Sequence, residues 1–142
     1  MKFWDSSALV PLFNAEPRTA DAESWLRSDP DITIWCLTRV EVLSALSRRR
    51  REFALSDNEY NIARNELGFA SPNWFQVTDF ERVRIEAERI VSVHPLRAAD
   101  ALQLGAALVA ADGEPETLEL VTLDRRLADA ARRERFPVLG VR

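Results

Sequence analysis

Short, strand-like apolar stretches alternate along this chain with longer helix-like segments, and this alternation most constrains its fold. The strand-like stretches are residues 2–5, 32–36, 74–77, 118–122 and 138–141. Helical patterns fill the intervals, at about 6–14, 16–28, 38–51, 56–67, 79–91, 96–111 and 124–135. Strands that alternate with helices indicate a parallel sheet with helices on both faces. We therefore expect an α/β fold, a three-layer α/β/α sandwich around a central, mainly parallel sheet.

Length and composition limit the kind of protein. The 142 residues, 46% of them hydrophobic, predict a single domain over residues 1–142. No stretch has the length and hydropathy of a membrane span, and the start of the chain lacks a signal-peptide pattern. Cys36 is the only cysteine and has no partner for an internal disulfide, so we expect a cytoplasmic protein. The net charge of -4 does not imply wholesale attraction to nucleic acid, although a local basic patch or metal ions on clustered acids could still bind RNA.

Acidic residues stand at the ends of several predicted elements. Asp5 follows the first strand, Glu41 lies in the first turn of the helix after the second strand, and Asp124 follows the fourth strand. Ligands of open α/β sheets bind outside the carboxyl ends of the strands. We therefore expect these three side chains at one edge of the sheet. Asp100 follows a helix, so the same rule does not place it.

Each of the three edge acids also has an ordinary structural interpretation. Asp5 and Asp124 are residue types that favour the start of a helix. Thr38-x-x-Glu41 is a capping-box pattern, in which the glutamate bonds back to the cap amide. The same pattern recurs at Ser56-x-x-Glu59 and Thr78-x-x-Glu81. By itself, Glu41 is therefore interpreted as a capping residue.

Asp100 begins a helix whose second half, from Leu104 to Ala111, carries no charge. A helix that is apolar all round is usually buried. An isolated buried carboxylate is costly and needs a cation nearby. Arg97, three residues earlier, or a metal ion could supply that charge, and the spacing does not decide between them.

Four clustered carboxylates have a definite chemistry. Like charges raise one another's pKa, and hard divalent cations such as Mg²⁺ and Mn²⁺ relieve the repulsion because they prefer oxygen ligands. One or two such ions, about 4 Å apart when paired, activate water and stabilise the leaving oxygen in phosphodiester hydrolysis. This chemistry needs no histidine. His94, the only histidine, precedes Pro95 and is predicted to lie in a surface loop.

Four short pieces around these acids follow one another in an order typical of a known family. They are Asp5-Ser6-Ser7-Ala8-Leu9, Thr38-Arg39-Val40-Glu41, the segment from Leu96 to Leu104, and Val121-Thr122-Leu123-Asp124. In these pieces the chain resembles the PIN-domain ribonucleases, and most closely the VapC-type toxins of prokaryotic toxin–antitoxin pairs. The resemblance extends nearly from end to end. The Arg-Ala-Ala-Asp-Ala helix start is its most specific part.

The resemblance implies an α/β/α sandwich and a Mg²⁺- or Mn²⁺-dependent endoribonuclease, the toxin of a type II toxin–antitoxin pair. It implies an RNA substrate, a cognate antitoxin protein and a homodimer. Ser7 and Thr122 match polar positions beside the family's metal site. The catalytic and metal-binding residues that it implies are Asp5, Glu41, Asp100 and Asp124. The chain departs from the family in a longer loop at 112–117 and in lacking a glycine near Arg135-Phe136.

Other features leave alternatives open. The run Arg48, Arg49, Arg50 and Arg51 could bind RNA, together with Arg97, or could be a solvated helix end. The four tryptophans are expected in the core rather than in base stacking. A catalytically silent RNA- or protein-binding module is one alternative function. Another is an aspartyl-nucleophile phosphatase, but Ser7 stands where such enzymes usually have a second aspartate.

Overall fold

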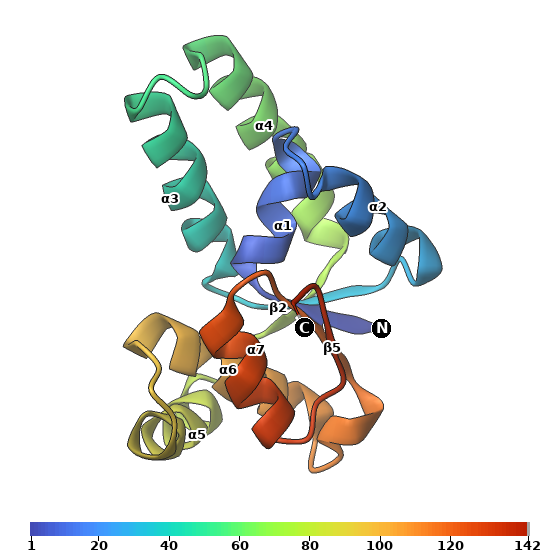
Figure 1. Ribbon diagram of the computed structural model, residues 1–142, viewed down its shortest axis with the longest axis vertical. Coiled ribbons are helices and arrows are strands. Elements are labelled where there is room, and N and C mark those ends of the chain that lie inside the picture. Colours follow the sequence, from blue (N-terminus) through green and yellow to red (C-terminus); the bar gives the residue numbers. More distant parts are fainter. Residues whose placement is uncertain (142) are drawn as a thin grey trace.

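Five parallel strands form one sheet in the order β3-β2-β1-β4-β5, as seen in a computed structural model that describes residues 1–141 (Figure 1). The strands are β1 (Lys2–Trp4), β2 (Ile32–Trp35), β3 (Phe75–Val77), β4 (Glu119–Val121) and β5 (Val138–Leu139). All four pairings are parallel. The first strand of the chain is therefore the central strand of the sheet. Arg142, the last residue of the predicted domain, lies outside the described residues.

Helices cover both faces of this sheet, which confirms the predicted α/β/α fold. Figure 1 shows one layer on one side, formed by α1 (Ser6–Phe13), α2 (Thr19–Ser28), α3 (Thr38–Arg51) and α4 (Asp57–Ala70). The other layer consists of α5 (Phe80–Val93), α6 (Ala98–Ala111) and α7 (Arg125–Arg133). None of the helices within residues 1–141 has the length and hydropathy that a membrane crossing requires.

The sheet separates two hydrophobic cores. Phe3 packs in the core under α5–α7, whereas the next residue, Trp4, packs in the core under α1–α4. Trp35 and Ile34 divide in the same way on β2. Successive side chains of a strand point to opposite faces, so a sheet covered on both sides needs apolar residues at every strand position. This requirement explains the short, continuous apolar stretches of the sequence.

The tryptophans contribute to these cores, as the sequence predicts. Trp4 and Trp35 are almost completely buried. Trp25 and Trp74 are partly buried and pack against the core under α1–α4. None of the four is therefore a free stacking platform for a nucleic-acid base.

Two predicted capping boxes have different outcomes. Ser56 caps α4, and its hydroxyl and the Glu59 carboxylate form the reciprocal bonds of a capping box. The capping box predicted at Thr78-x-x-Glu81 is wrong. Asp79 caps α5 instead. It lies one residue nearer to the helix than Thr78, and its carboxylate accepts the Arg82 backbone N–H at 3.2 Å.

The α6 helix is buried over much of its length, in agreement with its uncharged sequence. Residues 104–107 are buried, and Leu104, Ala106 and Ala107 belong to the core under α5–α7. Gly105 allows α5 to approach closely, since a Cβ at this position would lie 2.9 Å from the Val83 carbonyl oxygen. The helix that carries Asp100 is thus held firmly against both the sheet and α5.

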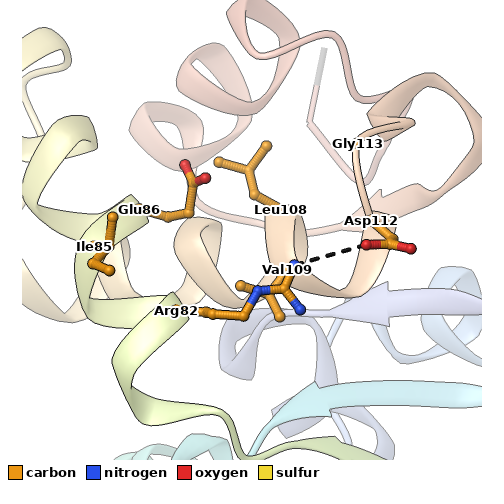
Figure 2. A pocket seen from close by; sticks show the side chains of 7 residues that line it. All are labelled: Arg82, Ile85, Glu86, Leu108, Val109, Asp112 and Gly113. Atoms are coloured by element: carbon orange, nitrogen blue, oxygen red, sulfur yellow. Dashed lines mark ion pairs between the residues drawn. The ribbon is translucent and has the colours of Figure 1, made fainter.

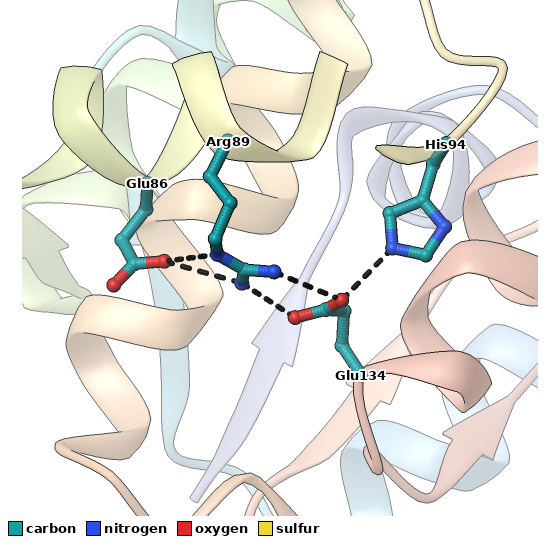
Figure 3. Close-up of polar contacts among 4 residues, drawn as sticks. All are labelled: Glu86, Arg89, His94 and Glu134. Atoms are coloured by element: carbon teal, nitrogen blue, oxygen red, sulfur yellow. Dashed lines mark hydrogen bonds and ion pairs between the residues drawn. The ribbon is translucent and has the colours of Figure 1, made fainter. Parts of the chain in front are cut away.

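His94 lies in the connection after α5, as predicted, but it is buried, so its predicted surface position is wrong. It follows α5, and its Nε2 lies 2.8 Å from Glu134 Oε2 (Figure 3). The Arg89 guanidinium donates to Glu134 Oε1 at 2.6 Å. The hydrogen bond from Arg89, followed by that from His94, holds the pKa of Glu134 below its usual range. His94 therefore joins the end of α5 to the end of α7.

Candidate functional site

Asp5 follows β1 directly and lies at the carboxyl edge of the sheet. Its backbone N–H donates to the Val121 carbonyl at 3.0 Å, and its side chain caps α1. The carboxylate is 3% exposed, and its Oδ2 accepts hydrogen bonds from the hydroxyls of Ser7 at 2.5 Å and Thr122 at 2.9 Å. Burial raises the pKa of Asp5, and these hydroxyls oppose the rise. Asp5 is thus both a helix cap and a fixed, buried carboxylate.

Ser7 and Thr122, the two residues predicted to support the site, both lie beside Asp5. The two hydroxyl oxygens are 3.2 Å apart. Ser7 Oγ accepts the Leu123 backbone N–H at 2.9 Å, and Thr122 Oγ1 accepts the Asp124 backbone N–H at 3.1 Å. The start of α1 and the end of β4 are therefore joined through these hydroxyls.

Asp124 caps α7, where its carboxylate accepts the Leu127 backbone N–H at 2.9 Å. Its structural interpretation is thus correct as far as the helix is concerned. Its negative charge nevertheless contributes to raising the pKa of both Asp5 and Asp100. Asp124 therefore lies within electrostatic reach of the other acids at the carboxyl edge of the sheet.

Glu41 is not a capping residue, so the capping box predicted at Thr38-x-x-Glu41 is wrong. The cap position of α3 is Leu37, and no side chain caps the helix there. Glu41 Oε1 instead accepts a hydrogen bond of 2.8 Å from Gln103, and Oε2 accepts one of 3.3 Å from Ser6. Burial raises the pKa of Glu41 to about 7, with further contributions from the charges of Asp5 and Asp100.

Asp100 joins this acidic group from the first turn of α6, where it is half-buried. Burial, followed by the charges of Asp124 and Asp5, raises its pKa to about 6. The cationic Arg97 and Arg126 oppose this rise without cancelling it. Asp5 and Asp100 thus raise the pKa of Glu41, and Asp124 raises the pKa of Asp5 and Asp100. Asp100, which the strand rule alone did not place, therefore belongs to the same acidic group.

The donor set has the chemistry of a hard divalent cation site. Its ligands would be carboxylate oxygens, and the raised pKa values of three of them show that burial and mutual repulsion disfavour their negative charge. No group of three or more acidic, histidine or cysteine side chains in residues 1–141 is already arranged to hold an ion.

The basic run does not lie at the acidic group. It forms the last turn of α3, at the end far from the sheet (Figure 1). Arg50 is about 13 Å from Glu41 along the helix axis. Arg49 forms an ion pair of 2.7 Å with Glu16, and Arg50 stacks 4.0 Å from the Tyr60 ring centre. Arg97, by contrast, is exposed beside Asp100 at the start of α6.

One surface pocket lies away from the acidic group. Figure 2 shows it between α5 and the end of α6, where Arg82 and Asp112 form an ion pair of 3.7 Å. None of the four predicted acids lines this pocket. The acidic group therefore lies at the carboxyl edge of the sheet, apart from this pocket.

Sequence reasoning missed two residues of the site. Ser6 has its hydroxyl 3.4 Å from Asp5 and 3.3 Å from Glu41, between the two carboxylates. Gln103 bonds Glu41 from α6. A signal for Gln103 was present, because it is the only polar side chain between Asp100 and Asp112 in an otherwise apolar helix.

The family model of the PIN domain matches residues 2–133. The chain belongs to the PIN domain family. The predicted membership is thus confirmed, and the match contains all four acids of the site. A comparison with curated proteins finds no match.

Solved structures with the same fold include three that are distant in sequence from this PIN domain. FitAcB from Neisseria gonorrhoeae is 16% identical with a TM-score of 0.69, and the match covers 98% of this chain and 96% of that one. A toxin–antitoxin complex from Klebsiella pneumoniae is 16% identical with a TM-score of 0.61, covering 90% and 91%. PAE2754 from Pyrobaculum aerophilum is 23% identical with a TM-score of 0.60, covering 91% and 83%.

Proposed function

We propose that this PIN domain is a metal-dependent endoribonuclease and the VapC-like toxin of a type II toxin–antitoxin pair in the cytoplasm. The observation that carries the proposal is the group of four carboxylates, three with raised pKa values, at the carboxyl edge of the sheet. The description of the Klebsiella pneumoniae structure as a toxin–antitoxin complex supports the biological role. The proposed cofactor is Mg²⁺ or Mn²⁺.

In this proposal Asp5, Glu41, Asp100 and Asp124 hold the cation. A bound divalent cation supplies positive charge that activates water and stabilises the leaving oxygen. Water adds to the phosphorus through its oxygen and gives up one proton, the phosphodiester P–O bond breaks, and the leaving oxygen takes up one proton. The hydroxyls of Ser7 and Thr122 keep Asp5 in place, since both donate to its Oδ2.

Arg97 is the cation best placed to contact the RNA backbone. It is exposed and lies beside Asp100, whose pKa its charge lowers. Within the basic run, Arg49 and Arg50 are engaged with Glu16 and Tyr60, while Arg48 and Arg51 are exposed. We therefore assign Arg97 to the phosphate next to the cleavage site. The exposed members of the run would bind RNA only farther along the strand.

The proposed partners are the RNA substrate, a cognate antitoxin protein and a second copy of this chain. A catalytically silent binding module is the second candidate function. One observation favours it, namely that no group of three ligands within residues 1–141 is preassembled for an ion. The two candidates differ in whether RNA is cut when metal is supplied.

Cleavage of a mixed RNA pool tests the proposal. The purified protein is incubated with Mg²⁺, with Mn²⁺ or with EDTA, beside the variants Asp5→Asn and Asp31→Asn. Asp31 is an exposed residue just before β2 and is the control for the same chemical change. We expect metal-dependent cleavage that Asp5→Asn abolishes and Asp31→Asn leaves intact. Undiminished cleavage by Asp5→Asn would show that the assigned site is wrong, and RNA binding without cleavage would favour the silent module.

A further inference from the structure

Gln103 is an unusual residue for its place in the protein. It is completely buried on α6, one turn after Asp100. Its amide nitrogen donates to Glu41 Oε1 at 2.8 Å and to Thr38 Oγ1 at 2.9 Å. A primary amide has two N–H groups, so both are used by these two residues of α3.

The amide nitrogen of Gln103, and not its oxygen, faces Glu41. This orientation suits the ionised carboxylate that would bind a cation, because an ionised carboxylate only accepts hydrogen bonds. The amide oxygen is left buried without a hydrogen-bond partner in the described chain. Burying an unpaired polar atom is unfavourable. The unpaired oxygen is therefore a cost of placing a glutamine here, which the two hydrogen bonds of its amide nitrogen offset.

We propose that Gln103 is a positioning residue, which fixes the Glu41 carboxylate for cation binding. This inference rests on the proposed metal-dependent function. With Oε1 held by Gln103, the other oxygen of Glu41 faces Ser6, whose hydroxyl also lies 3.4 Å from Asp5. Asp100 and Gln103 belong to the same rigid helix. The amide therefore sets the place of Glu41 relative to Asp100 as well as to Asp5.

Loss of this contact should weaken cation binding. A free Glu41 side chain would have to be ordered when the ion binds, at a cost in conformational entropy. Residues that orient metal ligands typically change metal affinity about 10-fold to 100-fold when substituted. We expect Gln103→Met, which keeps the length and apolar packing, to raise the Kd for Mn²⁺ about 10-fold.

The test is a direct measurement of Mn²⁺ binding by isothermal titration calorimetry, with the Tm of each variant recorded. Gln76→Met is the matched control, because Gln76 is the other glutamine of the chain and lies on β3. We expect its Kd to stay unchanged. Thr38→Val separates the two contacts of the amide, since it removes only the hydroxyl acceptor. It should lower the Tm and leave the Kd within about twofold, as the bond to Glu41 is kept.

The outcomes are distinguishable. An unchanged Kd in a folded Gln103→Met protein, or an equal loss of affinity in Thr38→Val, would overturn the positioning role and leave the proposed function standing. A parent protein that neither binds Mn²⁺ nor cleaves RNA would overturn both. If Gln103→Met does not fold, Gln103→Asn replaces it. This variant keeps the amide but is one methylene too short to reach Glu41, so a parent-like Kd would overturn the role.

Discussion

The Thr122 hydroxyl donates a 2.9 Å hydrogen bond to the buried carboxylate of Asp5 and so joins the ends of the neighbouring strands β4 and β1. Thr122→Val keeps the shape but removes this donor and the acceptor of the Asp124 backbone N–H. We expect a loss of about 1–3 kcal/mol in the free energy of unfolding, because a buried carboxylate loses a hydrogen bond. Urea denaturation measures this loss.

Thr33→Val is the matched control for that experiment. Thr33 is also fully buried, on β2, but its hydroxyl has no hydrogen-bond partner among residues 1–141. Replacing an unpaired buried hydroxyl by a methyl group is expected to leave the stability unchanged or to raise it by about 1 kcal/mol. Equal losses in the two variants would contradict the role given to the Thr122 hydrogen bond.

Cation binding should depend on pH in a defined direction. Burial is the main reason why the pKa values of Glu41 and Asp100 rise, to about 7 and about 6. Protons compete with a metal ion for carboxylates. The Kd for Mn²⁺ should therefore fall as the pH rises from about 5.5 to about 7.5, and level off above the pKa of Glu41. Calorimetric titrations over this range measure the trend, and a Kd independent of pH would argue against these ligands.

Without metal, the same pKa shift makes the protein less stable at high pH. Glu41 has a higher pKa in the folded chain than its ordinary value of 4.5, so the folded state binds more protons between 4.5 and about 7. Its contribution is fully present below 4.5 and is lost as the pH rises through about 7. In Glu41→Gln we expect this part of the pH dependence of the Tm to disappear.

Glu134→Gln should reduce stability without affecting cation binding. The Glu134 carboxylate of the parent protein accepts hydrogen bonds from Arg89 and from buried His94. We expect its replacement to lower the free energy of unfolding by about 1–3 kcal/mol. Glu134 and Asp124 stand at opposite ends of α7, about 15 Å apart along the helix axis. The Kd for Mn²⁺ should therefore stay at the parent value. The control is Glu88→Gln, which removes an exposed ion pair with Arg84 and should change stability very little.

Gly140→Ala should destabilise the fold beside Thr122, although Gly140 is not one of the predicted site residues. Gly140 has a φ of +113°, and an added Cβ would overlap the Thr122 carbonyl oxygen. We expect a loss of at least about 3 kcal/mol. Gly113→Ala is the control, since Gly113 also has a positive φ of 86° but open space around it, and should cost only about 1 kcal/mol. Similar losses in both variants would show that the close approach of Gly140 to the Thr122 carbonyl is unimportant.

The sheet could be predicted from sequence because its signals are local and redundant. Each strand is a short apolar stretch that ends in a turn or a polar residue. Because both faces of the sheet are buried, nearly every residue of a strand has to be apolar. Asp5 could be placed because it directly follows β1, and Asp124 because it comes three residues after the end of β4. Their interpretation as helix caps and their assignment to the site do not exclude each other, since both cap helices that start at the same edge.

The rest depended on contacts between distant segments. Glu41 matches a capping box in sequence, and only the approach of α6, with Gln103, shows that its carboxylate bonds elsewhere. His94 resembles a loop histidine until α7 brings Glu134 to it. Such pairings, separated by 62 and 40 residues, leave no periodic signal in one sequence.

The order of the strands has a consequence for protein synthesis. β1 is made first, yet it lies between β2 and β4, and β4 is followed closely by Thr122 and Asp124. A nascent chain that ends before Glu119 contains Asp5, Glu41 and Asp100 but has no β4 beside them. Under the proposed function, the cleavage centre is thus complete only after the ribosome has added β4 and Asp124 to the segments that carry the other three acids.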